Sequence, residues 1–289
     1  MSDKMRNLLV RGASGVVLFG VVLGAAFVGF WGFAALMMLI TVVGVWEFYN
    51  LAAAKGTEPQ RWIGIVASAL LIFFASGVVA EFLGAGVDLT SQLSIAALLA
   101  FFILGALMFV VEVFRAKQSP LLNIATTAMG VVYVALPLSL MCFVPMLANI
   151  NAETWNPWAF LCYLFLVWGN DVFAYLVGIS IGKHKMCERL SPKKSWEGFF
   201  GGVVGSLAMG ALGAYIVDGS YLVWIGLAAV VSLSSVVGDL AESMFKRDAG
   251  VKDSGNFIPG HGGMLDRFDA LILSAPFAFV YLIFVTILL

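Results

Sequence analysis

The sequence predicts an all-α, polytopic membrane helix bundle of about nine transmembrane helices, with the N-terminus in the cytoplasm and the C-terminus outside. Composition is the first observation that predicts this class: 62% of the 289 residues are hydrophobic and only 11% are charged. A soluble domain carries about 25% charged residues, so this chain cannot cover itself with a polar surface. Lipid is the solvent that suits it.

The lengths of the apolar runs are the second observation, because a helix that crosses a bilayer needs about 20 apolar residues. The N-terminal run is far longer than the apolar region of a signal peptide, and we divide it into two helices near Gly29–Gly32. Pro137 is expected to break or kink the fifth span. The nine expected spans are residues 12–29, 32–53, 62–80, 93–114, 122–148, 158–181, 198–217, 221–243 and 269–289.

The distribution of charge is the third observation and predicts the orientation. With a cytoplasmic N-terminus, all 16 Lys and Arg residues fall in cytoplasmic segments, as the positive-inside rule requires. We therefore expect an odd number of spans in the inner (cytoplasmic) membrane, with the polar loops facing the cytoplasm. The expected outside loops contain no Lys or Arg, and their charged residues are Glu81, Asp88, Glu153 and Asp218.

The unusual polar residues gather in the second half of the chain. Residues 1–150 are expected to form about five plain membrane helices, and residues 151–289 a catalytic membrane region with cytoplasmic loops 182–198 and 244–268. The three cysteines have no metal-ligand spacing, so no disulfide framework or zinc site is indicated. A nucleic-acid partner is not expected, because little water-facing surface is available to carry a basic patch.

The loop 182–198 holds five bases in 17 residues. Ser195 is expected to cap the following helix, and the bases before it lie beside the free N–H groups of that helix. Cations and free N–H groups together make a seat for phosphate. A purely topological role of the bases stays open, most of all for Lys183 and Lys185. The candidate phosphate ligands of this loop are Ser191, Lys193, Lys194 and Ser195.

The loop 244–268 combines bases with the run Pro-Gly-His-Gly-Gly at 259–263. Glycines permit close backbone approach, and consecutive N–H groups can form an anion-binding nest. His261 could donate to a phosphate or transfer a proton, although a plain loop histidine is an open alternative. The candidate substrate ligands here are Lys252, His261, Gly262, Gly263 and Arg267.

Acids beside these loops complete the predicted site, because an ionisable group inside a span is a functional-site hypothesis by default. Asp239, Glu242, Ser243 and Lys246 share one helix face. Carboxylate and hydroxyl oxygens suit Mg²⁺, which takes one or two carboxylates plus substrate phosphates. The alternative is an internal ion pair, such as one between Asp239 and a lysine of a neighbouring helix. Further candidates are Asp171, Glu242, Asp253 and Asp269.

Residues 243–269, SMFKRDAGVKDSGNFIPGHGGMLDRFD, closely resemble the motif of the phosphatidate cytidylyltransferase (CDP-diacylglycerol synthase) family. The stretches 238–243 and 191–198 resemble that family as well. Residues 1–150 match only as a run of membrane helices.

The resemblance implies a nucleotidyltransferase of phospholipid biosynthesis that converts CTP and phosphatidic acid to CDP-diacylglycerol and pyrophosphate. The family's acidic Mg²⁺ ligands fall on Asp239 and Asp266, with Ser243 nearby. Lys246 and Arg247 join the two acids as catalytic candidates that hold a substrate phosphate. Similarity also suggests K⁺ as a second cation and a homodimer.

Three other functions remain open at this point. Intramembrane acids and a basic vestibule would suit a transporter or channel for an anionic solute, although paired interrupted helices are not evident. A different lipid transferase is the second alternative: the Asp-rich helix of the CDP-alcohol phosphotransferases is absent here, whereas nucleotide preference would separate a dolichol kinase-like enzyme. A membrane scaffold would leave the polar residues unexplained.

Overall fold

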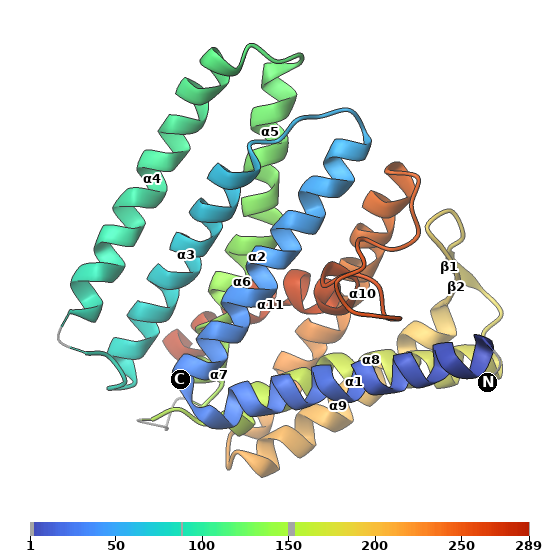
Figure 1. Ribbon diagram of the computed structural model, residues 1–289. Helices are drawn as coiled ribbons and strands as arrows, with labels where there is room; N and C mark the ends of the chain where they lie inside the picture. Colours follow the sequence, from blue (N-terminus) through green and yellow to red (C-terminus); the bar gives the residue numbers. More distant parts are fainter. Residues whose placement is uncertain (1–2, 88, 150–153, 289) are drawn as a thin grey trace. The chain divides into compact units, whose positions relative to one another are not determined.

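The computed structural model describes residues 3–87, 89–149 and 154–288 (Figure 1). Within these ranges, nine helices are long and apolar enough to cross a membrane. The predicted class, an all-α polytopic membrane protein, is therefore confirmed, while the orientation of the termini stays a prediction. Asp88 and Glu153, two of the acids expected in outside loops, lie outside the described residues.

The helices follow the expected spans closely. In chain order they are α1 (Asp3–Val28), α2 (Phe30–Ala54), α3 (Arg61–Phe82), α4 (Thr90–Arg115), α5 (Pro120–Gly130), α6 (Leu136–Met141), α7 (Val144–Ala148), α8 (Pro157–Ile181), α9 (Trp196–Ile216), α10 (Tyr221–Asp248) and α11 (Leu265–Leu288). The predicted hairpin between the first two spans lies at Gly29, whose φ of 120° suits glycine.

The fifth span is irregular, as the proline in it predicted. A π-helical segment, η1 (Val131–Ala135), joins α5 to α6, and Pro137 is the second residue of α6. Proline lacks an N–H group and crowds the preceding turn, which disrupts regular α-helical bonding there.

Two boundaries of the predicted loop 244–268 are corrected by the structure. Helix α10 continues through Lys246 and Arg247, and α11 already begins at Leu265, so Asp266 and Arg267 are helical. The expected spans follow the apolar residues alone, so they leave out the charged residues at the end of α10 and the start of α11. The charges suit these helix ends, because bases favour the last turn of a helix and an acid favours the first.

The loop 182–198 contains a small hairpin that the sequence analysis did not predict. Strand β1 (Lys185–Cys187) pairs antiparallel with β2 (Ser191–Ser195). The hairpin is short and lacks an alternating apolar pattern, so periodicity gives no signal for it.

The chain divides into two compact units. Unit 1 comprises Met1–Cys142 and Phe245–Phe268, and unit 2 comprises Phe143–Met244 and Asp269–Leu289. Helix α10 thus ends in unit 1, and α11 begins there. The predicted division of function near residue 150 stays a prediction.

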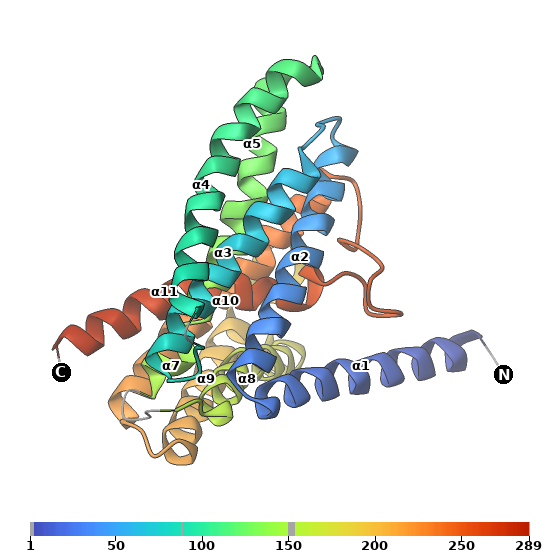
Figure 2. The ribbon, with the colours of Figure 1, turned by 60° about the vertical axis from the view of Figure 1, so that its left-hand side comes forward.

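Helix α2 forms the centre of unit 1. Its Phe48 packs edge-on against Phe245 at 5.8 Å between ring centroids, and Tyr133 of η1 lies 5.0 Å from Phe245. The Tyr49 hydroxyl donates to Thr127 O at 2.7 Å. Figure 2 shows α2 to α5 running side by side, while α1 extends away from them at a steep angle.

Helices α8 and α9 pack closely in unit 2 through glycines. A Cβ at Gly202 would lie 2.6 Å from Asn170 Oδ1, and one at Gly169 would lie 2.6 Å from the side chain of Met209. Small residues let membrane helices approach closely. This contact places the N-terminus of α9 beside the end of α8, where the candidate phosphate loop begins.

Candidate active site

Asp239 of α10 forms the polar centre of unit 2. Lys194 Nζ of β2 lies 2.6 Å from Asp239 Oδ2, and Ser243 Oγ donates to Asp239 Oδ1 at 3.3 Å. Both side chains are partly exposed, so the pair is open to solvent. Asp239 therefore does form an ion pair, although its lysine comes from strand β2 and not from a neighbouring helix. Ser243 places a hydroxyl beside the same carboxylate.

A cavity of about 470 Å³ surrounds this pair within unit 2. Asp171 of α8 lines it and interacts electrostatically with Lys194 and Asp239. Lys193 and Ser195 line the same space, and two aromatic rings, Tyr175 and Phe199, add apolar surface. The cavity thus combines bases, acids and aromatic rings.

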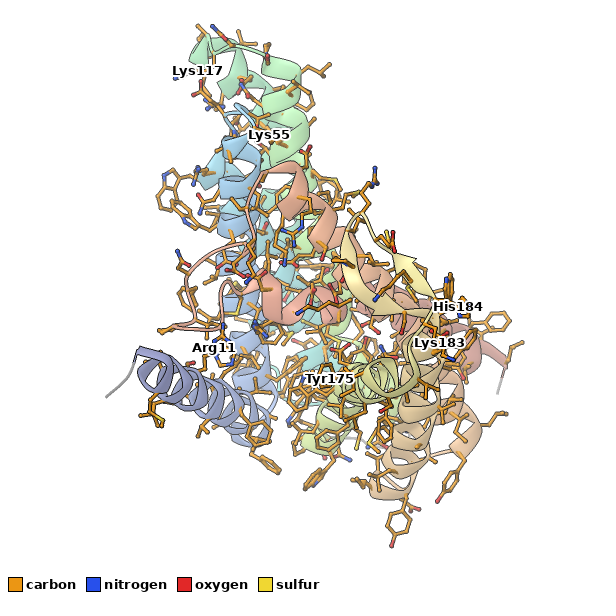
Figure 3. The ribbon with its side chains drawn as sticks, turned by 90° about the vertical axis from the view of Figure 1, so that its right-hand side faces the viewer. Arg11, Lys55, Lys117, Tyr175, Lys183 and His184 are labelled. Atoms are coloured by element: carbon orange, nitrogen blue, oxygen red, sulfur yellow. The ribbon has the colours of Figure 1, made fainter. Side chains whose placement is uncertain are left out.

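Ser195 caps α9 as predicted. Its Oγ accepts a hydrogen bond from Gly198 N at 3.2 Å. Glu197, in the first turn, accepts from the backbone N–H groups of Lys183 and His184 at 3.1 and 3.2 Å and lies 2.6 Å from His184 Nδ1. Figure 3 shows Lys183 and His184 beside each other at the surface of the unit. Glu197 therefore ties the start of the loop to α9.

Asp266 forms the polar centre of unit 1. Lys246 Nζ lies 2.6 Å from Asp266 Oδ1, and both side chains are largely buried. Asp266 Oδ2 accepts hydrogen bonds from Ser254 N at 2.9 Å, Ser254 Oγ at 3.0 Å and Gly263 N at 2.8 Å. The glycine-rich loop is therefore wrapped around one oxygen of this carboxylate.

Glu47 of α2 supports that loop, and the sequence analysis missed it. Its Oε2 accepts from Leu265 N at 2.9 Å and from Ser254 Oγ at 3.2 Å, and the side chain is only 3% exposed. A Cβ at Gly263 would lie 2.5 Å from this oxygen, and one at Gly255 would meet the other carboxylate oxygen. An acid inside a span was the signal that could have found it.

Glu112 of α4 is a second intramembrane acid that the sequence analysis did not single out. Its two oxygens contact Arg115 Nη1 at 2.7 Å, Gln60 Nε2 at 2.6 Å and Asn123 Nδ2 at 2.8 Å. Both carboxylate oxygens are satisfied by these neighbours, so we assign Glu112 a structural role in joining α3, α4 and α5.

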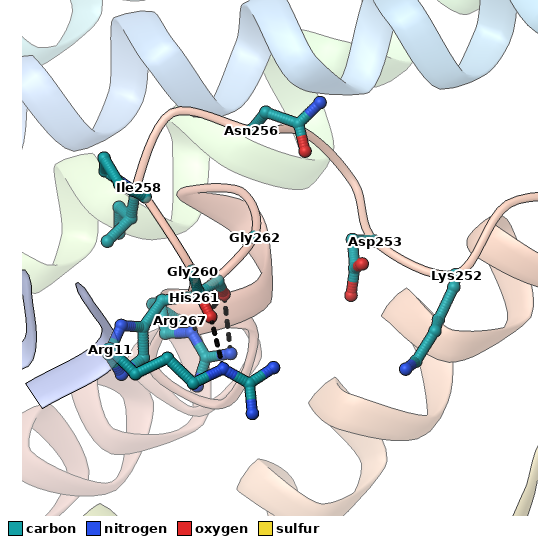
Figure 4. Close-up of a pocket in the computed structure, with 10 residues that line it drawn as sticks. Arg11, Lys252, Asp253, Asn256, Ile258, Gly260, His261, Gly262 and Arg267 are labelled. Atoms are coloured by element: carbon teal, nitrogen blue, oxygen red, sulfur yellow. Dashed lines mark hydrogen bonds between the residues drawn. The ribbon is translucent and has the colours of Figure 1, made fainter. Parts of the chain in front are cut away.

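A second polar cavity, of about 490 Å³, lies entirely within unit 1 (Figure 4). Arg11 Nε of α1 donates to Gly260 O at 2.8 Å, and Ser14 Oγ donates to Pro259 O at 2.7 Å. Arg267 donates to His261 O from Nε at 2.9 Å and from Nη2 at 2.7 Å. Lys252, Asp253 and Asn256 also line the cavity.

His261 faces this cavity, and its Nδ1 lies 2.8 Å from Ser14 Oγ. Burial is the largest cause that lowers the pKa of His261 below its usual value, and the charges of Arg267 and Arg11 lower it further. The imidazole is therefore neutral near pH 7.

The predicted site residues thus gather in two groups. Unit 1 holds Lys246, Lys252, Asp253, His261, Gly262, Gly263, Asp266 and Arg267; unit 2 holds Asp171, Lys193, Lys194, Ser195, Asp239 and Ser243. The other candidates belong to the same two units but make separate contacts. Arg247 donates to Val251 O at 3.0 Å, Ser191 pairs with Cys187 in the hairpin, Asp269 Oδ1 accepts from Ala270 N, and Glu242 is buried in α10.

Comparison with known proteins decides the family. The profile of the cytidylyltransferase family matches residues 9–285. The chain belongs to the cytidylyltransferase family. This cytidylyltransferase is 32% identical over 293 residues to a protein of Synechocystis sp. named phosphatidate cytidylyltransferase, an alignment that covers 93% of this chain and 94% of the relative.

Two further relatives bear the same name and align over shorter stretches. The Staphylococcus aureus (strain COL) protein is 47% identical over 127 residues, or 43% of this chain and 49% of the relative. The Mycobacterium bovis protein is 40% identical over 151 residues, or 48% and 47%. The family resemblance read from the sequence is therefore confirmed.

Proposed function

We propose that this cytidylyltransferase is a phosphatidate cytidylyltransferase, which converts CTP and phosphatidate to CDP-diacylglycerol and pyrophosphate in phospholipid biosynthesis. The observation that carries the proposal is the family match over residues 9–285, together with a relative of that name aligned over 93% of the chain. Nine apolar helices among the described residues suit a substrate that stays in the bilayer.

The reaction needs positioning more than proton transfer. The phosphomonoester of phosphatidate has a second pKa of about 6, so its oxygen is largely ionised near pH 7. That oxygen attacks the α-phosphorus of CTP, and the bond from the α-phosphorus to the bridging oxygen breaks. Pyrophosphate leaves with the electron pair.

The oxygen donors present fit Mg²⁺. No group of three or more His, Cys, Asp or Glu side chains that could hold a metal occurs among the described residues. Mg²⁺ needs only one or two carboxylates plus substrate phosphates and water, and Asp239 with Ser243 Oγ supplies such oxygens. Held by Asp239 and Ser243, Mg²⁺ would offset phosphate charge in the transition state. Asp266 stays the second acid that the family resemblance assigns to Mg²⁺, and K⁺ is proposed as a second cation.

The bases hold the phosphates in this proposal. Lys194 and Lys246 each lie 2.6 Å from a site carboxylate, so a phosphate brought to either acid meets an ammonium group. Lys193 lines the cavity around Asp239, where it would contact the triphosphate. Arg247 adds positive charge at the end of α10.

The proposal also includes the setting of the enzyme. The positive-inside distribution of all 16 bases supports a site at the cytoplasmic face of the inner membrane. The family resemblance supports a homodimer. Protease protection of tags at the two termini in inverted and right-side-out vesicles tests the orientation, and chemical cross-linking tests the dimer.

Product formation tests the activity. Purified protein in detergent is incubated with phosphatidate, labelled CTP and Mg²⁺, beside Asp266→Asn and Lys117→Gln. Lys117 forms an exposed ion pair with Glu58, so its variant is the matched control. We expect CDP-diacylglycerol and pyrophosphate from the wild type and the control, and none from Asp266→Asn. Failure of folded wild-type protein to form product with any nucleotide would contradict the proposal.

A further inference from the structure

We infer that the cavity of unit 1 holds the phosphomonoester of the lipid substrate, and that Arg11 of α1 is one of its phosphate ligands. This inference rests on the proposed function and divides the two substrates between two described cavities. The nucleotide then belongs to the cavity of unit 2, which contains Lys193 and Lys194.

The charge of the unit 1 cavity suits a dianion. Arg11, Lys252 and Arg267 contribute three positive charges to its lining, and Asp253 contributes one negative charge. A phosphomonoester carries about −1.5 to −2 charges at pH 7. The cavity therefore offers roughly the opposite charge to such a group.

Arg11 is held in place before any ligand arrives. Its Nε donates to Gly260 O at 2.8 Å, which fixes the guanidinium against the loop. Figure 4 shows the guanidinium of Arg11 and the ammonium of Lys252 entering the same opening. The planar fork of a guanidinium matches phosphate oxygens, and a fixed side chain loses little freedom on binding.

The apolar surface of the helix that carries Arg11 favours a lipid as the ligand. Arg11 lies at the start of the membrane span Leu9–Val28, and the neighbouring side chains of α1 are apolar and exposed, with Val16 at 72% and Val17 at 64%. Acyl chains could lie along this helix while the headgroup reaches Arg11.

The aromatic residues of the two cavities support the same assignment of the substrates. Nucleotide bases are commonly held on aromatic rings. No Phe, Tyr or Trp is among the described residues that line the unit 1 cavity, whereas Tyr175 and Phe199 line the cavity of unit 2. The base of CTP is therefore better accommodated beside Lys193 and Lys194.

Separate Michaelis constants test the assignment. In full-length protein at fixed detergent, Arg11→Gln should raise KM for phosphatidate about tenfold and leave KM for CTP unchanged. Lys252→Gln, on the opposite side of the opening, should act in the same direction and covers the case that Arg11→Gln does not fold. An equal rise for both substrates, or a rise for CTP alone, would overturn the assignment.

Ser14→Ala is the control for loop positioning. It removes the hydroxyl that contacts Pro259 O and His261 Nδ1, and it keeps the charge of α1. We expect the ratio of the two KM values to stay at its wild-type value. If Ser14→Ala reproduced the selective effect, Arg11 would act on the loop and not on phosphate.

Binding without turnover separates this inference from the proposed function. Calorimetry with wild type and Arg11→Gln compares short-chain phosphatidate, inorganic phosphate, pyrophosphate and CTP. Selective loss of phosphatidate binding supports the lipid seat, even if wild-type protein forms no CDP-diacylglycerol. Weaker binding of inorganic phosphate by the variant is expected as well, because the same charges attract that dianion. A loss of pyrophosphate or CTP binding as large as that of phosphatidate, or unchanged phosphatidate binding, would refute the inference.

Discussion

Glu47 of α2 accepts a hydrogen bond of 2.9 Å from the backbone N–H of Leu265, the first residue of α11. The two residues are 218 positions apart in the sequence. Ser254 Oγ lies between two acids, 3.2 Å from Glu47 Oε2 and 3.0 Å from Asp266 Oδ2. A buried acid of the first half of the chain thus positions the glycine-rich loop, whose Ser254 and Gly263 hydrogen-bond to the candidate metal ligand Asp266.

We expect Glu47→Ala to lower kcat about 100-fold, because a small displacement of Asp266 is enough to disturb the reacting groups. The N–H of Leu265 would also lose its buried acceptor. Measuring kcat across a Mg²⁺ titration checks this, since a displaced Asp266 should also raise the Mg²⁺ concentration needed. Glu58→Gln, at an exposed ion pair, is the control. Glu47→Ala with activity within about twofold of wild type would argue against a positioning role.

Gly263→Ala should reduce activity by at least about tenfold, because its Cβ would lie 2.5 Å from Glu47 Oε2 and the loop would have to move. Gly105→Ala on α4 is the matched control, since its Cβ would meet no atom within 4 Å. Thermal unfolding and specific activity are measured together. Equal unfolding temperatures and equal specific activities of the two variants would show that a Cβ at Gly263 fits without moving the loop.

Lys194→Gln should raise KM for CTP about tenfold, because a charged contact to the triphosphate is lost. Lys193→Ala should act in the same direction from the same cavity. Initial rates at varied CTP and saturating phosphatidate measure the effect. An unchanged KM for CTP in both variants would argue against phosphate binding by either residue. Lys194 would then serve only as the ion-pair partner of Asp239, and Lys193 only as a topological anchor.

Protonation of His261 should lower the stability of the folded protein as the pH falls. Its pKa is lowered in the folded protein, mainly by burial, so the unfolded chain takes up a proton first as the pH drops through about 6.5. Stability contributed by the neutral imidazole is therefore lost between that pH and the lower folded pKa. Unfolding midpoints at pH 7.5 and 5.5 should differ less in His261→Gln than in wild type. The same difference in both proteins would exclude this origin.

The membrane spans could be predicted because apolar length is a local property of the sequence. The capping role of Ser195 and the irregularity before Pro137 were predicted for the same reason. The hairpin β1–β2 was missed because five or fewer residues per strand leave no periodic signal.

The role of Glu47 could not be derived from any window of the sequence, because its partners lie more than 200 positions away. Its presence inside a span was still a visible signal. Glu47 and Glu112 both lie in residues 1–150, which the sequence predicts to be plain membrane helices. In both cases, the cost of an acid in lipid indicated that a partner had to exist.

The long separation between Glu47 and Ser254 also has a consequence for biosynthesis. Ser254 is translated 207 positions after Glu47, and chains grow at about 5–20 residues per second, so the acid waits roughly 10 to 40 s for this partner. Until then, the nascent second helix carries a carboxyl group without the loop that later encloses it. Synthesis of the glycine-rich loop therefore supplies the hydrogen-bond partners that Glu47 of α2 lacks until then.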